Sequence, residues 1–86
     1  MARSLRTPGH QALMQVLIST RKKTGATQQE LASKLGRPQS FVAKVETGER
    51  RLDVVEFVEW FDALEVDPAA AIASIQSALA TSSDRE

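Results

Sequence analysis

The chain has no cysteine and a single histidine, His10, among its 86 residues. The lack of cysteine excludes disulfides, thiolate metal sites and cysteine nucleophiles, and it fits a reducing compartment. His10 has no carboxylate at ligand spacing beside it, so it cannot anchor a metal by itself. We therefore expect no metal ion and no cofactor.

Long hydrophobic runs are also missing from the sequence. No apolar run reaches the length of about 18 residues that a membrane-spanning helix needs. The N-terminal segment lacks the hydrophobic stretch of a signal peptide. The length allows one compact domain, near the lower limit at which a hydrophobic core supports itself. These features predict a soluble, intracellular protein of one domain.

The charges balance over the whole chain but not within its two parts. Residues 1–51 carry ten Lys or Arg against three Glu, a net charge of +7. Residues 52–86 carry one Arg against eight acidic residues, a net charge of −7. Such asymmetry is expected when one face of a protein meets a polyanion and the other does not. The alternative is an ordinary solvated surface on which the charges have segregated by chance.

Helix start and stop signals divide the chain into five predicted helices, and no segment has the alternating pattern of a strand. The first helix begins at the cap formed by Thr7 and Pro8 and ends at Gly25. Capping-box spacings open the second and fourth helices, and an Asp-Pro pair opens the fifth. The predicted fold class is therefore all-α, with five helices.

The predicted domain covers residues 9–80, between an N-terminal arm at 1–8 and a disordered tail at 81–86. The helices that matter most for function are predicted at about 27–35, about 38–47 and about 68–80.

The second and third predicted helices are separated only by Gly36 and Arg37, too few residues for an antiparallel pair. They must cross steeply, as in a helix-turn-helix unit. Gly36 suits a left-handed turn, and Ala32 is small enough for a close crossing. The alternative is a helical hairpin bundle that does not bind DNA.

A resemblance to the lambda Cro and repressor-like family, often called the Xre family, is carried by the stretch TQQELASKLGRPQSFVAKVETGERRLDVVEFVEW. It covers roughly residues 9–67 and rests on nine residues in matching spacing: Gln28, Leu31, Ala32, Leu35, Gly36, Val42, Val45, Glu46 and Gly48. The resemblance implies a lambda-repressor-like fold and binding of double-stranded DNA. The chain departs from the family at the turn: it has Arg37 and Pro38 at positions where family members often have Ser or Thr.

A helical wheel of the third predicted helix separates two sectors. The outward sector, about 140° wide, consists of Gln39, Ser40, Ala43 and Lys44. The opposite sector consists of Phe41, Val42 and Val45. Gln can pair with adenine, Ser can donate or accept, Lys can reach guanine or a phosphate, and Ala can touch a thymine methyl. The resemblance places base-reading positions at Gln39, Ser40 and Lys44, while Phe41 either packs in the core or makes an apolar base contact.

Phosphate contacts position such a helix and need donors at the ends of elements. The candidates are Thr27, Gln28, Arg37, Thr47, Arg50 and Arg51. The first two begin the second helix, where free N–H groups and the helix dipole attract an anion. The resemblance implies that Gln28 clamps a phosphate.

The resemblance also implies a partly buried ion pair between Arg21 and Glu46. Arg21 lies late in the first predicted helix and Glu46 late in the third, and each follows an apolar stripe. Two separate solvated charges are the alternative.

Two other groups of residues could suggest different chemistry. Ser40 and Lys44 lie one turn apart, as in a hydrolytic pair, but nothing nearby offers an oxyanion site or a pocket. Glu56, Glu59 and Asp62 recur every three residues, yet such carboxylates are usually the solvated face of a helix. We therefore expect that the protein is not an enzyme.

Two functions from different classes remain. The first is a sequence-specific transcriptional regulator, a repressor or antitoxin-like autoregulator, in the cytoplasm and associated with the nucleoid. The second is a protein-interaction module, in which the acidic second half and the apolar last helix bind another protein and DNA contact is incidental. A toxin or another protein is the candidate protein partner. Salt-dependent binding to a specific duplex separates the two.

A single short helix reads few base pairs, so we expect a homodimer on a palindromic operator. The predicted dimer seam is a narrow apolar stripe on the last helix, made of Ile72, Ile75 and Leu79. The alternative is that this stripe closes the domain's own core.

Overall fold

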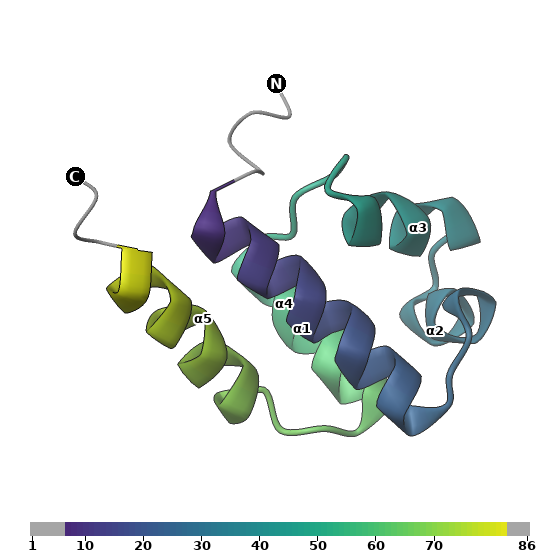
Figure 1. The fold of residues 1–86 in the computed structure, drawn as a ribbon. Helices are drawn as coiled ribbons and strands as arrows, with labels where there is room; N and C mark the ends of the chain where they lie inside the picture. Colours follow the sequence, from purple (N-terminus) through teal and green to yellow (C-terminus); the bar gives the residue numbers. More distant parts are fainter. Residues whose placement is uncertain (1–6, 83–86) are drawn as a thin grey trace.

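The computed structural model describes residues 7–82 (Figure 1). Its helices are α1 (Pro8–Thr24), α2 (Gln28–Leu35), α3 (Gln39–Thr47), α4 (Val54–Leu64) and α5 (Ala69–Ser82). No strand occurs in these residues, so the prediction of an all-α fold with five helices is confirmed. Helix α1 takes in the last residue of the predicted arm, and α5 continues two residues into the predicted tail. The rest of the arm up to residue 6, and the tail from residue 83, lie outside the described residues.

The predicted caps explain where the helices begin. The Thr27 hydroxyl accepts a hydrogen bond from the Glu30 amide at 3.0 Å, and the Glu30 carboxylate accepts one from the Thr27 amide at 2.9 Å. These two bonds complete the capping box of α2. Asp53 and Glu56 form the same arrangement at the start of α4. Helix α3 differs from its prediction, because Pro38 is its N-cap and the helix begins one residue later.

Helix α4 ends at Glu65 in an unusual backbone conformation. Glu65 has a φ of 59°, the left-handed region that glycine normally occupies at a helix C-terminus. A residue with a side chain adopts this region at a cost of about 1 kcal/mol. The end of α4 is therefore a local site of strain.

The hydrophobic core lies mainly among α1, α2, α3 and α4, and α5 contributes the buried Ala71. Its largest fully buried side chains are Leu17, Leu31, Val42, Trp60 and Phe61. The indole Nε1 of Trp60 has no hydrogen-bond partner among residues 7–82. This missing bond carries a cost, which the burial of the large apolar ring outweighs. The interpretation of Trp60 as a core anchor is confirmed.

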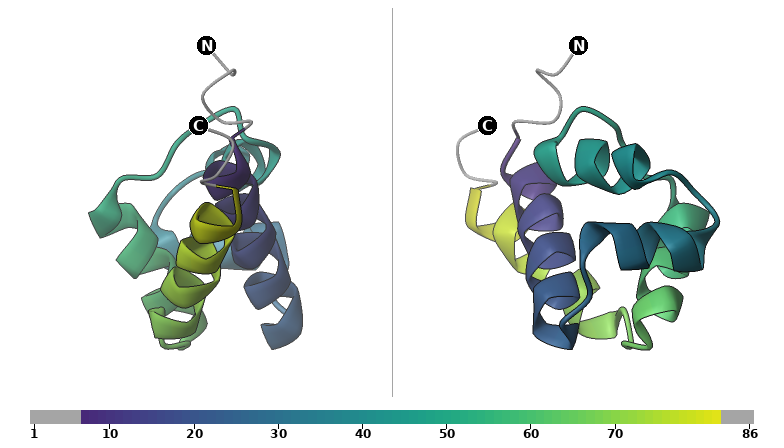
Figure 2. Two further views of the ribbon diagram at one scale, coloured as in Figure 1. Left: turned by 60° about the vertical axis from the view of Figure 1, so that its left-hand side comes forward. Right: turned by 90° about the vertical axis from the view of Figure 1, so that its right-hand side faces the viewer.

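Helix α5 lies alongside α1, on the side away from α2 and α3 (Figures 1 and 2). Ala71 is buried and Ile75 packs against the core, whereas Ile72 and Leu79 remain 53% and 52% exposed. Leu79 also lies against the start of α1, since a Cβ added at Gly9 would be 2.8 Å from its Cδ2. The three residues of the predicted seam therefore do not share one environment.

Candidate nucleic-acid interface

Helices α2 and α3 form a helix-turn-helix unit. Figure 1 shows α2 nearly end-on while α3 lies across the view, so the two helices cross steeply. The connection consists of Gly36, Arg37 and Pro38, and the φ of Gly36 is 69°, a left-handed conformation. Ala32, on α2, is fully buried. The steep crossing expected from the short turn is present.

The burial of side chains along α3 follows the predicted sectors. The outward residues Gln39, Ser40 and Lys44 are exposed, and Ala43 is half-buried. The buried residues of the helix are Val42, Val45 and Glu46. Phe41 is half-buried and packs against the core. An exposed polar side of α3 is thus available to a ligand.

A buried ion pair joins α1 to α3. Arg21 donates from Nε to Oε2 of Glu46 at 2.6 Å and from Nη2 to Oε1 at 3.0 Å. The two side chains are only 9% and 5% exposed. Arg21 Nη1 also donates to the carbonyl of Ala26 at 2.9 Å, which ties the pair to the segment before α2. Bidentate bonds between charged groups are strong and directional, so they fix the position of α3 relative to α1.

The ion pair continues toward the surface through two glutamine side chains. Gln28 Nε2 donates to Oε1 of Glu46 at 2.9 Å, and Gln39 Nε2 donates to Oε1 of Gln28 at 2.8 Å. From the sequence we expected Gln28 at a phosphate and Gln39 at a base, and did not predict that they meet. The available signal was that each begins a helix and that the short turn brings the two helices together.

A second polar cluster surrounds the ring of Phe41. The guanidinium carbons of Arg37 and Arg50 lie 4.3 and 4.9 Å from the ring centre. Both arginines donate to the carboxylate of Glu56 on α4, Arg37 through Nη2 at 3.1 Å and Arg50 through Nη1 and Nη2 at 2.8 and 3.1 Å. Glu56 is 12% exposed, against 37% and 42% for the arginines. The expectation that Glu56 belongs to a solvated face was therefore wrong.

Electrostatics at this cluster favour the ionised carboxylate. The hydrogen bonds from Arg50, then the amide of Asp53, and then Arg37 lower the pKa of Glu56 to about 2, although burial acts in the opposite direction.

Burial and the positive charge of Arg51 lower the pKa of His10 below 6.5. The charge of Arg51, in the loop after α3, therefore acts on the first turn of α1.

The remaining phosphate candidates differ in how far they are already engaged. Thr27 uses its hydroxyl in the capping box of α2. The Thr47 hydroxyl lies 3.2 Å from the carbonyl of Lys44 and 3.3 Å from a carboxylate oxygen of Glu49. Arg51 is exposed. Arg37 and Arg50 are held by Glu56, so the structure does not bring all six candidates together as one set of open donors.

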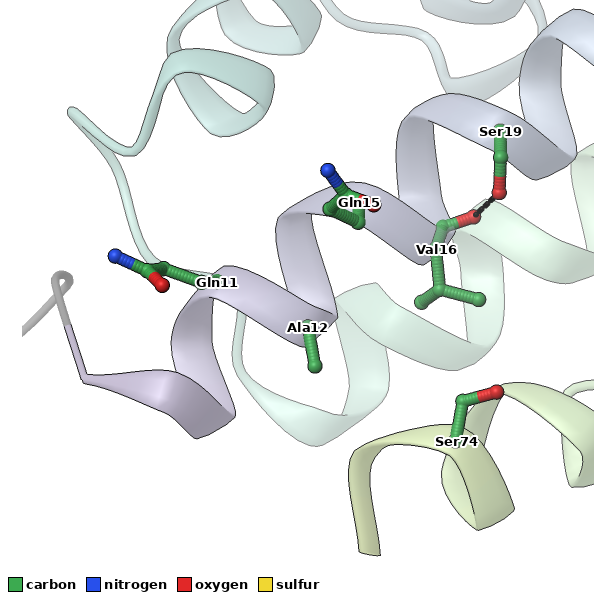
Figure 3. Close-up of a pocket in the computed structure, with 6 residues that line it drawn as sticks. All are labelled: Gln11, Ala12, Gln15, Val16, Ser19 and Ser74. Carbon is green, nitrogen blue, oxygen red and sulfur yellow. Dashed lines mark hydrogen bonds between the residues drawn. The ribbon is translucent and has the colours of Figure 1, made fainter. Parts of the chain in front are cut away.

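A surface hollow between α1 and α5 offers no catalytic group. It has a volume of about 460 Å³ and is lined by Gln11, Ala12, Gln15, Val16, Ser19 and Ser74 (Figure 3). Figure 3 shows Ala12 and Val16 turned toward α5 and Gln15 turned away from it. The polar groups of the lining are amides and hydroxyls, so it contains no acid or base.

Two absences within residues 7–82 also bear on function. No three His, Cys, Asp or Glu side chains within this range gather in a way that could hold a metal ion. None of the helices in the same range is long and apolar enough to cross a membrane.

The chain is similar to known helix-turn-helix proteins. Residues 13–73 match a family model described as a helix-turn-helix domain. The structure is similar to that of an XRE-family like protein from Pseudomonas syringae pv. tomato str. DC3000, with a TM-score of 0.78 and 43% sequence identity. That match covers 87% of this chain and 92% of the other. A search of curated proteins gave no match.

Proposed function

This chain belongs to the XRE-type helix-turn-helix family of DNA-binding regulators, and we propose that it regulates transcription by laying α3 in the major groove of a specific operator. In this arrangement the outward side of α3 meets the base edges while α2 crosses the DNA backbone. The family model and the similar structure confirm the family resemblance drawn from the sequence.

The observation that carries the proposal is the hydrogen bonding of the Gln39 side chain. One N–H of its amide is bonded to Gln28, which leaves a second N–H and the carbonyl oxygen. These two groups are what a glutamine uses to pair with the N7 and N6 positions of adenine. Since Gln28 is itself bonded to Glu46, the side chain is ordered by the protein before it meets a base.

The other outward residues of α3 complete the proposed reading surface. Lys44 has the reach for guanine acceptors, and Ser40 can donate to or accept from a base. Ala43 lies between them and is small enough to contact a thymine methyl. All three belong to the side of α3 that faces away from the core.

The proposed phosphate contacts flank this surface. Gln28 keeps one N–H of its amide, and Thr27 lies beside it at the start of α2, where the helix dipole favours an anion. Thr47 and Arg51 lie at the end of α3 and in the loop beyond it. Arg37 gives one of its three nitrogens to Glu56, so its other donors remain for a phosphate.

Arg50 is different from these candidates. It gives both terminal nitrogens to Glu56, and Nη1 also donates to the carbonyl of Arg51 at 2.5 Å. We therefore assign it to the positioning of the loop rather than to a direct phosphate clamp.

The proposed regulator acts as a homodimer on a palindromic operator, because two copies of one short reading helix double the site. Ile72 and Leu79 support a seam on α5, since they lie two turns apart and both are half exposed. A dimer that occupies an operator blocks access of other proteins to the same DNA. This is the action of a repressor or an antitoxin-like autoregulator, and its place in the cell would be the nucleoid.

Selection of bound sequences from a pool of random duplexes tests the proposal. We expect one enriched sequence with two related half-sites about 34 Å apart. Its affinity should fall with salt, with a log-log slope of about −0.9 for each phosphate neutralised. Failure to enrich any sequence would exclude a sequence-specific regulator.

A second candidate function is a protein-interaction module. The exposure of Val54 and Val55, at 74% and 62%, favours it, because these apolar residues lie on α4 in the acidic half of the chain. Such a protein would bind all duplexes weakly and alike. The same selection therefore separates the two functions.

A further inference from the structure

A single carboxylate on α4, that of Glu56, contacts one residue before α3 and one residue after it in the sequence. Arg37 precedes the first residue of α3 by two positions, and Arg50 follows the last by three. Both donate to Glu56, and both guanidinium groups lie over the ring of Phe41, which belongs to α3 itself. The cluster thus links the turn before α3, the helix, and the loop after it to the first turn of α4.

We propose that Glu56 is a positioning residue for sequence-specific DNA binding, which fixes both ends of α3 by holding Arg37 and Arg50 against Phe41. This inference rests on the proposed function, since it assigns to Glu56 the alignment of the reading helix. Glu56 itself makes no contact with DNA in this proposal.

The burial of Glu56 indicates that it holds the arginines rather than competes with DNA for them. Its side chain is only 12% exposed, and its carboxylate accepts three guanidinium bonds. It also accepts a bond from the amide of Asp53 at 3.1 Å, which fixes its direction within the capping box of α4. A phosphate that displaced it would leave a largely covered carboxylate without its charged partners, which is unfavourable.

The position of the cluster indicates an effect on specificity. The core holds α3 from within through Val42 and Val45, which are 0% and 2% exposed. The cluster acts instead at the ends of the helix, near the residues proposed to contact DNA. Base contacts tolerate displacements of only about 0.5 Å. A small tilt of α3 would therefore weaken base readout more than phosphate contact.

The Glu56→Gln variant and a matched control, Glu59→Gln, isolate this role. Gln at position 56 can still accept the N-cap amide, so the capping box survives while the charged partner of the arginines is lost. Glu59 is exposed, lies on the same helix, and makes no ion pair with any residue in the range 7–82. Both variants remove one negative charge, so their general electrostatic effects on DNA binding cancel in the comparison.

The first measurement uses the full chain and two duplexes, the selected operator and a scrambled one. Relative to Glu59→Gln, we expect Glu56→Gln to lower the ratio of operator affinity to scrambled affinity about fivefold. An equal ratio in the two variants would overturn the proposal. A rise in operator affinity specific to Glu56→Gln would also overturn it, because the carboxylate would then compete with phosphates.

The second measurement needs no DNA. The amides of Phe41 and Glu49 bond across the two ends of α3, to Pro38 at 2.9 Å and to Lys44 at 2.8 Å. In Glu56→Gln, but not in Glu59→Gln, hydrogen exchange at both amides should quicken about threefold or more relative to amides in the middle of α1. Unchanged exchange at either amide would overturn the inference, because Glu56 would then not fix that end of α3 in the free protein. A wild-type protein that does not distinguish the two duplexes would instead overturn the proposed function.

Discussion

Gln39 donates a hydrogen bond of 2.8 Å to Gln28, so the first residue of α3 is joined to the first residue of α2. Gln28 in turn donates to Glu46, whose other partner is Arg21. The side chain proposed to read a base is thus ordered through a path that ends in the core. Ordering before binding lowers the entropy cost of forming the complex.

We expect Gln39→Ala and Lys44→Ala to weaken binding to the operator by about 1 to 3 kcal/mol each, and binding to random DNA by less. Arg51→Ala should weaken both by similar factors, because a phosphate contact carries no sequence information. Anisotropy titrations on both duplexes measure the difference. Parallel changes in all three variants would show that α3 is not the reading helix.

Removal of either partner of the Arg21–Glu46 pair should lower the free energy of unfolding by about 3 to 5 kcal/mol, because the other charge is left buried and unpaired. Replacing both residues by apolar ones of similar volume should recover much of that loss. Urea unfolding of the single and double variants gives the coupling energy. A coupling energy indistinguishable from zero would contradict the prediction.

Acid should destabilise the protein through Glu56. Its pKa is lowered from 4.5 to about 2 in the folded state, so the unfolded chain takes up a proton first as the pH falls. The stabilisation is complete above about pH 5 and is lost progressively toward pH 2. In urea titrations at several pH values, Glu56→Gln should show a shallower acid dependence than Glu59→Gln. Identical curves for the two variants would rule this out.

The dimer predicted from α5 can be tested by sedimentation of the wild type and of Ile72→Asp. A charge at position 72 should shift the protein toward monomer, because Ile72 is exposed and belongs to the proposed seam. Ile75 is a poor probe, since it packs against the core and a charge there would disturb the fold. Ser77→Asp, also at an exposed position on α5, is the control. A wild type that stays monomeric and binds operator DNA one to one would defeat the prediction.

Glu65→Gly should stabilise the protein by about 0.5 to 1 kcal/mol, because glycine adopts the left-handed conformation at the end of α4 without strain. Gly25→Ala is the reverse experiment, at a φ of 83°, and should destabilise by a similar amount. Urea midpoints measure both. A loss of stability in Glu65→Gly would show that its side chain makes a compensating contact.

The helix boundaries could be predicted closely because caps are local signals. The capping boxes that begin at Thr27 and Asp53 lie within four residues of sequence and form as their spacing indicates. The crossing of α2 and α3 followed from a turn too short for any antiparallel arrangement. Neither inference requires knowledge of the rest of the chain.

The contacts of the candidate site could be predicted only in part, because they join segments far apart in the sequence. The pairing of Arg21 with Glu46 came from family resemblance, while the two glutamines that extend it left no pattern of their own. Glu56 has the sequence pattern of a capping residue, and only the packing of the turn and the loop places Arg37 and Arg50 over it. Periodicity on α5 identified apolar positions but not which of them face α1.

Trp60 gives the chain an intrinsic optical reporter. It is the single tryptophan, the sequence has no tyrosine, and its ring is fully buried. In the folded protein the indole therefore emits from apolar surroundings, while unfolding transfers it to water. Its Nε1 has no hydrogen-bond partner in the described part of the chain, so it gains hydrogen bonds to water on unfolding, which adds to the red shift. The emission maximum can thus follow the unfolding of each variant described above without any attached label.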